Sequence, residues 1–600
     1  MIIYKMANKT IKRYMTIAGS IVLIFGCKQE SKHESSEIKQ PNIVLILTDD
    51  QGWGDLSFNG NENLNTPHID GIAKNGVSFE NFYVQPVCSP TRAELLTGRH
   101  YTRLGVYSTS EGGERINLKE TTIADILKKE GYQTAAYGKW HNGMQAPYHP
   151  NARGFDDFYG FASGHWGNYF SPMLEHNGKV VQGEGFLVDD LTNKGLNFIA
   201  KNRDQPFFLY LPYNTPHSPM QVPDQYWNTF ENKALSTSFR SSEDEDVEFT
   251  KAALAMVENI DYNVGRVLQQ LKDLQLEENT IVIFMSDNGP NSWRWNGGMK
   301  GKKGAVDEGG VRTPFFIQWK NTLPAGKIVN EIASAIDVLP TLSDLTKSNN
   351  TTQKPVDGKS LKPLLLASET AWTSRLIYNH WSGKTSVRSQ KYRLDHNNQL
   401  FDIENDRAQK KDISSSFANM RDSLILLKKQ WLKETHTNQE IADHRYFTLG
   451  DPEFEYTHIP ARDGIPHGTI KRSNRWPNDS YFTNWTSEKD SITWKVDVVA
   501  DGNFEVDLYY TLAPADVGVK ITLRNGQNEL EAILKEAHNP APYGMENDRI
   551  ERAESYVKDF KKLTIGEIKL QQGKRNLVLQ APHINGSTAM DVRLLVFRRL

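Results

Sequence analysis

The chain contains little cysteine and little net charge. Only two of its 600 residues are cysteine, Cys27 and Cys88, which excludes a disulfide-rich scaffold. A net charge of -3 gives no overall electrostatic basis for binding nucleic acid or an anionic membrane surface, so we expect no nucleic-acid partner. No internal repeat and no long low-complexity segment is apparent. With 38% hydrophobic and 24% charged residues, the composition is that of a globular protein, and the length predicts two or more domains.

The N-terminus has no long hydrophobic run, but it has a short one that ends at Cys27. Basic residues precede the run "MTIAGSIVLIFGC", which ends at Cys27 and is too short for a comfortable transmembrane helix. The pattern "IFGC" resembles a bacterial lipoprotein signal, so we predict a signal peptide over 1–27, lipidation of Cys27 and a polar tether over 28–40. The alternatives are a plain secretory signal or an uncleaved anchor. All three interpretations predict an exported protein. The lipoprotein signal further predicts a bacterial lipoprotein in the periplasm or at the outer membrane or cell surface, held to the membrane only by lipid on Cys27.

Strands alternating with helices dominate the first half of the chain. "NIVLILTDD", "TAAYGKW", "PFFLYLPYN", "TIVIFMSDN" and "TPFFIQW" are short apolar runs typical of buried strands, separated by helical segments such as "TTIADILKKEGY". The pattern predicts an α/β domain over 41–345, with a mixed, largely parallel sheet between layers of helices.

The second half reads differently. A small antiparallel sheet followed by a helix is expected within 346–445, and alternating apolar and polar residues with Gly-containing turns predict an all-β sandwich over 450–600. Trp476, Trp485 and Trp494 lie in this last part and are candidate sugar platforms, although Trp494 lies inside an alternating strand and is better interpreted as core. The sandwich is therefore either a carbohydrate-binding module or a structural domain, because fold does not imply function.

Acidic and amide side chains follow two of the predicted strands. Asp49 and Asp50 end the first, and Asp287 and Asn288 end another. The carboxyl ends of strands line the ligand crevice of open α/β sheets. Oxygen ligands of this kind suit a hard divalent cation such as Ca²⁺, whereas no His/Cys cluster has the spacing of a zinc site.

Cationic and imidazole side chains occur at similar places along the chain. They follow strand ends or lie in Gly-rich loops, and they are Arg92, Lys139, His141, His217 and Lys303. Singly, each is adequately explained as a surface lysine or a core histidine. Together with a metal, they would bind a multiply oxygenated anion such as a sulfate or phosphate ester.

Five blocks of this sequence resemble one known family. "CSPTR", Cys88 to Arg92, is similar to the C-x-P-x-R signature of formylglycine-dependent sulfatases in the alkaline-phosphatase superfamily. "TDDQGWGD", "GKWHNG", "DNG" and "KGAVDEGGVR" resemble the family's other blocks, in its order. "GKWHNG" departs from the usual "GKWHLG" but keeps the charged residues. The resemblance covers roughly 41–345, with the small C-terminal sheet continuing to about residue 434, and it implies a sulfuric ester hydrolase of alkaline-phosphatase-like fold.

The resemblance also implies roles for the site residues. Cys88 would be oxidised by a formylglycine-generating maturation enzyme to 3-oxoalanine, whose hydrated aldehyde attacks sulfur. One Ca²⁺ would be held by Asp49, Asp50, Asp287 and Asn288 and would also touch residue 88, and Asp287 would accept the proton of the attacking hydroxyl. Arg92 would orient the diol, and Lys139 and Lys303 would contact sulfate oxygens. His217 is the candidate general acid for the leaving alcohol, and His141 is the candidate base that triggers release of sulfate.

The expected substrate is an external sulfated polysaccharide or oligosaccharide. Candidate substrate contacts are His165, Trp166 and Asn168 in the Gly-rich loop 160–172, and His380 in "NHWSG"; ordinary loop packing explains the first segment equally well. Two alternatives remain open: a phosphoester or phosphonate hydrolase of the same superfamily, and a non-catalytic glycan-binding lipoprotein in which Cys88 stays a thiol.

Overall fold

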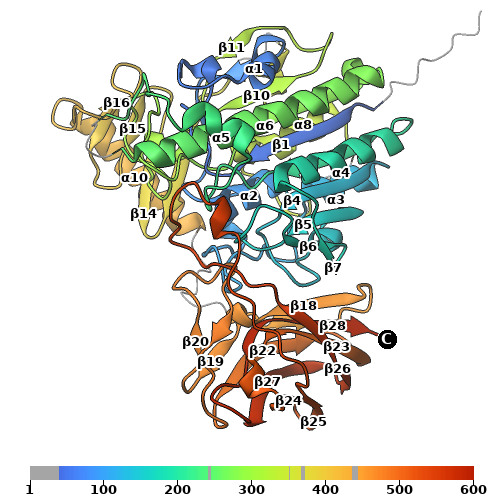
Figure 1. Cartoon of the computed structure of the whole chain (residues 1–600). Helices are drawn as coiled ribbons and strands as arrows, with labels where there is room; N and C mark the ends of the chain where they lie inside the picture. The colour runs from blue at the N-terminus through green and yellow to red at the C-terminus, as the bar shows by residue number, and fades with distance from the viewer. Residues whose placement is uncertain (1–39, 241–244, 350–351, 367–371, 436–443) are drawn as a thin grey trace, which may run out of the picture. The chain divides into compact units, whose positions relative to one another are not determined.

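The computed structural model describes residues 40–240, 245–349, 352–366, 372–435 and 444–600. Among them, ten strands form one large mixed sheet (Figure 1). In spatial order these are β11 (Lys327–Val329), β2 (Val77–Phe79), β10 (Phe315–Gln318), β9 (Thr280–Ser286), β1 (Asn42–Thr48), β8 (Phe207–Pro212), β4 (Gln133–Lys139), β5 (Asp157–Phe161), β6 (Met173–His176) and β7 (Lys179–Gln182). The central run from β9 to β5 is parallel, whereas β10, β6 and β7 are antiparallel to their neighbours. The mixed, largely parallel sheet expected from the sequence is confirmed.

Strand β1 shows why the centre of this sheet is so apolar. Every residue of "NIVLILT" is buried, and β1 lies between β8 and β9, both parallel to it. Side chains alternate between the two faces of a strand, so Leu45 and Leu47 pack into one core and Val44 and Ile46 into the other. A strand covered on both faces needs apolar residues at consecutive positions.

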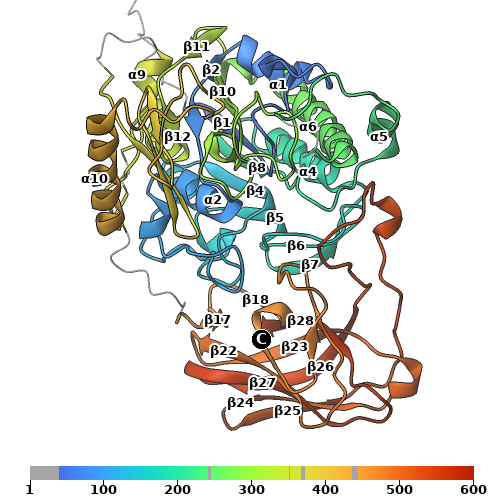
Figure 2. The same cartoon turned by 90° about the vertical axis from the view of Figure 1, so that its left-hand side faces the viewer.

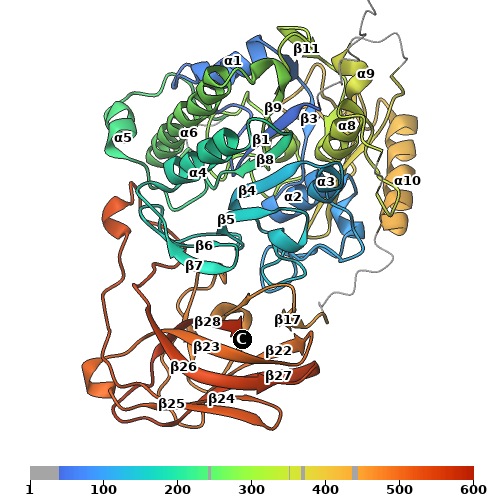
Figure 3. The ribbon, with the colours of Figure 1, turned by 90° about the vertical axis from the view of Figure 1, so that its right-hand side faces the viewer.

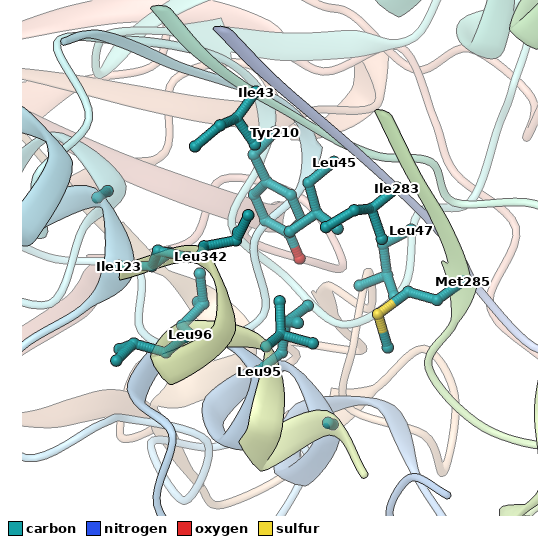
Figure 4. Packing of buried hydrophobic residues seen from close by; sticks show 14 of the residues in the cluster. Ile43, Leu45, Leu47, Leu95, Leu96, Ile123, Tyr210, Ile283, Met285 and Leu342 are labelled. Carbon is teal, nitrogen blue, oxygen red and sulfur yellow. The ribbon is translucent and has the colours of Figure 1, made fainter. Parts of the chain in front are cut away.

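Helices cover both faces of the sheet, as Figure 3 shows. On one face lie α1 (Pro67–Lys74), α4 (Leu187–Lys201), α5 (Asp224–Phe230) and α6 (Val247–Asp273). On the other lie α2 (Cys88–Thr97), α3 (Ile123–Lys129) and α8 (Val338–Leu345). Figure 4 shows the core between α2 and the sheet from close by, with Leu96 of α2 beside Leu342 of α8; Leu95, Leu96 and the β1 residues Leu45 and Leu47 belong to one cluster. This packing sets the start of α2 near the carboxyl ends of the central strands.

A smaller antiparallel sheet follows the large one in sequence. It consists of β13 (Ile377–Trp381), β14 (Lys384–Arg388), β15 (Tyr392–Leu394) and β16 (Leu400–Asp402). Helix α10 (Ala418–Thr435) lies beside this sheet (Figure 2). Its Leu424 packs in one cluster with Val387, Leu394 and Leu400 of the sheet. Two short helices, α7 (Glu308–Val311) and α9 (Lys362–Leu365), and the strand pair β3 (Phe82–Tyr83) and β12 (Ala333–Ser334) complete this region.

The last part of the chain is a two-sheet sandwich, drawn from orange to red in Figure 1. One sheet contains β17 (Phe447–Leu449), β22 (Ser491–Val498), β27 (Gly573–His583), β24 (Lys520–Asn525) and β25 (Asn528–Ile533), with β19 (Ile465–His467) beside β22. The other contains β20 (Lys471–Arg472), β21 (Phe482–Thr483), β28 (Asp591–Arg599), β23 (Gly502–Thr511) and β26 (Lys561–Leu570), with β18 (Tyr456–Pro460) beside β28. Trp485 and Trp494 are each only 1% exposed in the core between them.

Residues 40–600 form one compact unit, so the domain boundaries expected from composition remain predictions. The expected signal peptide and nearly all of the tether lie outside the described residues. Within the described part of the chain, no helix has the length and apolar character needed to cross a bilayer.

Candidate active site

The carboxyl ends of β1 and β9 bring the two acidic pairs together. The strands are in register up to Thr48 and Ser286, so the residues that follow them meet at one edge of the sheet. The Asp50 amide donates to Asp287 Oδ1 at 3.2 Å, and Asn288 Nδ2 donates to Asp50 Oδ1 at 2.8 Å. Asp50 has φ 65°, a left-handed conformation that aspartate adopts more readily than bulkier residues. The edge of the sheet therefore gathers four oxygen-bearing side chains.

Helix α2 places Cys88 and Arg92 at this edge. Cys88 is the first residue of the helix, and Arg92, four residues later, lies on the same face. The Arg92 guanidinium donates through Nε and Nη2 to Asp287 Oδ2 at 3.0 and 2.8 Å, and through Nη1 to the Lys139 carbonyl at 2.7 Å. Cys88 is 3% exposed, and its sulfur lies within 4.8 Å of oxygens of Asp49 and Asp287. Burial raises the pKa of the Cys88 thiol, so the thiol is not activated as a thiolate.

Two lysines neutralise the two carboxylates that follow β1. Lys139 Nζ lies 2.5 Å from Asp49 Oδ2, and Lys303 Nζ lies 2.8 Å from Asp50 Oδ1. Burial alone would raise the pKa of Asp49, but the charge of Lys139, followed by those of His217 and Arg92, holds it far below its ordinary value. The pKa of Lys303 is raised, because the attraction of Asp50 outweighs burial. Lys303 is therefore charged at neutral pH.

The carboxylates fit a hard cation. Asp49 Oδ1 and Asn288 Oδ1 are buried and have no hydrogen-bond partner in the described part of the protein. Burial, and next the charge of Asp49, raises the pKa of Asp287 to about 7 despite the Arg92 contact. A bound cation would give the unpaired buried oxygens a partner, and its positive charge would favour the ionised form of Asp287. This donor set, with oxygens from three carboxylates and one amide, suits Ca²⁺.

His217 faces the acidic pair. Its Nδ1 lies 2.6 Å from the Ser218 carbonyl and donates to it, which leaves Nε2 on the site side, 3.7 Å from Asp50 Oδ2. A ring nitrogen of His217 and one carboxylate oxygen each of Asp49 and Asp50 lie within 4.8 Å of one another. Burial, and next the charge of Lys303, lowers the pKa of His217. With Nδ1–H donating to the carbonyl and the pKa lowered, Nε2 carries a lone pair in this state. It can contribute a nitrogen to a bound cation, and it can deliver a proton to a leaving group after gaining one.

His141 follows β4 with φ 63°, and its ring is fixed by the loop before it. Nε2 lies 2.8 Å from the Thr109 carbonyl and donates to it, while the buried Nδ1 has no hydrogen-bond partner among the described residues. Burial, and next the charge of Lys139, lowers the pKa of His141 well below the ordinary value. The ring is therefore neutral, with a lone pair on Nδ1, which is the state that a proton acceptor requires.

The candidate substrate residues lie in different surroundings. The His165 ring centroid is 5.5 Å from that of His217, and both His165 nitrogens are buried without a partner in the described structure. Trp166 stacks on Phe161 at 5.0 Å, and Asn168 Nδ2 donates to the Phe170 carbonyl at 2.5 Å. These two side chains therefore make packing and loop contacts.

His380, the fourth candidate, lies in β13. Its Nδ1 is 2.7 Å from Thr385 Oγ1, and its ring stacks with Tyr101 at 6.4 Å and tilts against Trp431 at 6.3 Å. These are contacts of the small sheet with α10 and with the segment after α2. The expectation that His380 binds substrate stays a prediction.

Sequence reasoning missed the side chains of the sandwich that reach this site. Asn478 Nδ2 donates to the Thr109 carbonyl at 3.1 Å, the same oxygen that His141 contacts. A second group comes from residues 543–557, here called the strap. Gln221, four residues after His217, donates through Nε2 to the strap residues Gly544 and Asp548 at 2.6 and 2.8 Å. Glu554 of the strap accepts from the Ser218 hydroxyl. No local signal in the sequence points to these contacts.

Known proteins are similar to this chain over the region just described. The family model named Sulfatase matches residues 41–348. The mouse N-acetylgalactosamine-6-sulfatase is 33% identical over 365 residues, covering 55% of this chain and 67% of the relative. Human arylsulfatase A is 33% identical over 401 residues, covering 59% and 74%. The crystal structure of Ps i-CgsB in complex with k-i-k-neocarrahexaose is 33% identical, with a TM-score of 0.61, and covers 67% of this chain and 94% of that one.

These matches and the site agree with one another. The family model begins one residue before β1 and extends past α8, so it spans the strand ends and the helix that carry the acidic pairs and Cys88. The sequence resemblance drawn from five short blocks is thereby confirmed. The chain belongs to the sulfatase family and is a sulfuric ester hydrolase.

Proposed function

We propose that this protein hydrolyses a sulfate ester on a sulfated carbohydrate, using a formylglycine formed from Cys88 and one Ca²⁺. The observation that carries the proposal is the position of Cys88. It begins α2, with its sulfur within 4.8 Å of oxygens of Asp49 and Asp287, and Arg92 stands one helical turn away. Carbohydrate is the favoured substrate class because the names of similar proteins include N-acetylgalactosamine-6-sulfatase and a complex with neocarrahexaose.

Formylglycine would supply the nucleophile. A maturation enzyme, using an external two-electron oxidant such as dioxygen, would convert the –CH₂SH of Cys88 to –CHO. In this step the C–S bond is replaced by C=O, with oxygen at the level of water, and the sulfur leaves as sulfide. The hydrated aldehyde then offers one hydroxyl for attack on the sulfur of the sulfate ester and a second for release of sulfate. The raised pKa of the buried thiol supports the need for this change, because an unmodified Cys88 would be a poor nucleophile at neutral pH.

The surrounding side chains would hold the sulfate and move protons. Ca²⁺ would be held by the four oxygen-bearing residues after β1 and β9, and it would add a positive charge that polarises the sulfate. Lys139 and Lys303 each carry a fixed positive charge toward the same edge, where negative charge develops in the transition state. Arg92, locked onto Asp287, would orient residue 88 and keep Asp287 placed to take the proton of the attacking hydroxyl.

The two histidines would share the remaining proton transfers. His217 has Nδ1 committed to the Ser218 carbonyl, so Nε2 would carry the proton delivered to the leaving alcohol. His141 has Nε2 committed to the Thr109 carbonyl, so Nδ1 would accept the proton whose loss releases sulfate. His165 lies next to His217, and its ring nitrogens have no hydrogen-bond partner among the described residues, so it would contact the sugar. We also propose that the protein is exported as a bacterial lipoprotein and is anchored to the membrane by lipid on Cys27.

Mass spectrometry tests the modification directly. The tryptic peptide spanning 75–92, from protein made with a maturation enzyme, should show the lower mass of an aldehyde at position 88. The same preparation should hydrolyse 4-nitrophenyl sulfate faster than 4-nitrophenyl phosphate at equal concentration, and Cys88→Ala should abolish turnover. An intact thiol, with a control sulfatase modified in the same cells, would reject the formylglycine mechanism. Preference for the phosphate ester would instead favour a phosphoester hydrolase.

A further inference from the structure

The β-sandwich touches the catalytic centre through the loop between β20 and β21. Asn478, in this loop, donates to the Thr109 carbonyl that also fixes His141. Its Oδ1 accepts from Arg462 Nη1 at 2.6 Å and lies 3.4 Å from the Ser163 hydroxyl, in the loop that carries His165. Asn478 therefore lies against two of the loops that build the site.

The same loop is fixed at its other end. Asn474 Nδ2 donates to the Ala553 carbonyl of the strap at 2.9 Å, and Asn474 Oδ1 accepts from the Trp476 amide at 2.9 Å. Held at both Asn474 and Asn478, the intervening residues have a defined position. Chain geometry limits the Trp476 Cα to about 7 Å from the Cα of Asn478. Trp476 thus lies close to Asn478, whose side chain contacts the loops of His141 and His165.

Trp476 is also unusual in its exposure. Its side chain is 50% exposed, whereas Trp485 and Trp494 are each 1% exposed in the sandwich core. The Arg475 guanidinium carbon lies 4.8 Å from the centroid of the Trp476 ring, and Arg475 is itself exposed. A half-exposed tryptophan beside an exposed arginine offers an apolar face and a fork of donors at the same place.

We propose that Trp476 and Arg475 form a binding subsite for the sugar residue next to the one that loses its sulfate. This inference rests on the proposed function and adds a recognition site from the appended sandwich. The indole would stack on the apolar face of the neighbouring sugar ring, and the guanidinium would bind a sulfate or carboxylate on that sugar through paired hydrogen bonds. The occupant is a sugar of the same chain because the subsite lies two residues from Asn478, which contacts the loops of His141 and His165.

The test compares a long and a short substrate on full-length, matured protein. The long probes are sulfated hexasaccharides prepared from carrageenan and from chondroitin sulfate, and the short probe is 4-nitrophenyl sulfate. Trp476→Ala should lower kcat/KM about 5- to 10-fold for whichever hexasaccharide is cleaved and leave the aryl sulfate rate unchanged. Arg475→Ala should lower the same kcat/KM and reduce its dependence on salt.

A matched control is available on α6. Tyr262 is also 50% exposed, and the Arg266 guanidinium carbon lies 5.8 Å from its ring centroid, so Tyr262→Ala removes a similar surface pair away from the sandwich. Equal effects of Trp476→Ala and Tyr262→Ala on the hexasaccharide would overturn the inference. Equal losses on long and short substrates would show a structural effect and would overturn it too.

Binding separates this inference from the catalytic proposal. Calorimetric titration of Cys88→Ala protein with the two hexasaccharides needs no turnover. Weaker binding after the further change Trp476→Ala supports the subsite even if neither ester is hydrolysed, which would reject the proposed function alone. Absence of binding to both hexasaccharides, or binding that Trp476→Ala leaves unchanged, would overturn the subsite.

Discussion

Replacing Glu308 by glutamine should be strongly destabilising, although the two side chains have nearly the same shape. Glu308 begins α7 and is fully buried. Its carboxylate lies 2.8 Å from Arg393 Nε, 3.3 Å from Arg388 Nε and 3.8 Å from Arg312 Nη1, and it accepts from the Tyr83 hydroxyl at 3.1 Å. These partners come from the small sheet, from the end of α7 and from β3. One carboxylate therefore neutralises guanidinium groups from several elements.

The size of the effect follows from the charges left behind. Glutamine keeps the packing and part of the hydrogen bonding but removes the negative charge, so buried arginines lose their shared counter-ion. Removing one partner of a buried ion pair costs about 3–5 kcal/mol. For a compact unit spanning 40–600 that corresponds to a fall in the thermal midpoint of roughly 3–4 °C.

The stability lost in Glu308→Gln should depend on pH, and the pKa of Glu308 gives the direction of that dependence. Burial alone would raise the pKa of Glu308, but Arg393, Arg388 and Arg312 hold it below its ordinary value of 4.5. A group whose pKa is lowered on folding contributes its stability above the unfolded pKa and loses it as the pH falls through the folded pKa. The difference between wild type and Glu308→Gln should thus be constant from about pH 6 to 9 and should shrink in acid.

The assay is differential scanning fluorimetry from acid to about pH 9, so that both the constant region and the acid region are measured. Glu453→Gln, at an exposed position, is the matched control. Glu453→Gln should move the midpoint by less than about 1 °C. If Glu308→Gln behaves like the control at neutral pH, the arginines do not depend on this carboxylate and the reasoning is refuted.

Two further predictions concern the metal and the N-terminus. A chelator should abolish activity and lower the thermal midpoint, and Ca²⁺ at 100 times its dissociation constant should restore both by adding about 2.7 kcal/mol of stability; full activity after exhaustive chelation would reject the metal site. In a bacterial host, labelled palmitate should enter the wild-type protein and be absent from Cys27→Ala protein, and label retained by that variant would exclude Cys27 as the lipidated residue.

Much of the fold was predictable because the relevant signals are local. Strand β1 is a continuous apolar run of β-branched residues and leucines, and β9 is similar, so both could be recognised from a few residues each. The polar pairs that follow them had to meet once the strands were neighbours in a parallel sheet. Cys88 and Arg92 were recognisable through the resemblance of "CSPTR" to the C-x-P-x-R signature, and the structure places them one turn apart in α2.

The rest depends on contacts between distant parts of the chain. Asn478 and Thr109 are 369 residues apart, and the Gln221 contact with Asp548 spans 327 residues, so no periodicity within either segment could indicate them. The tryptophans of the sandwich show the same limit. Trp476 and Trp485 lie nine positions apart in similar polar sequence, yet one is half-exposed and the other is buried. Which face of the sandwich each one meets is decided by packing of the whole domain.

The strap has a consequence for when the enzyme becomes active during its synthesis. The helix that carries Cys88 and the strands around it are made early. The strap follows much later: its Gly544 lies 323 residues after Gln221, and its Glu554 lies 336 residues after Ser218. Domains of a growing chain fold largely from the N-terminus onward. A nascent chain would therefore present the sulfur, the carboxylates and the lysines well before the His217 loop acquires its final support. The site would then be complete, and the enzyme able to hydrolyse its substrate, only after most of the sandwich has been synthesised. The order of synthesis would set when activity begins.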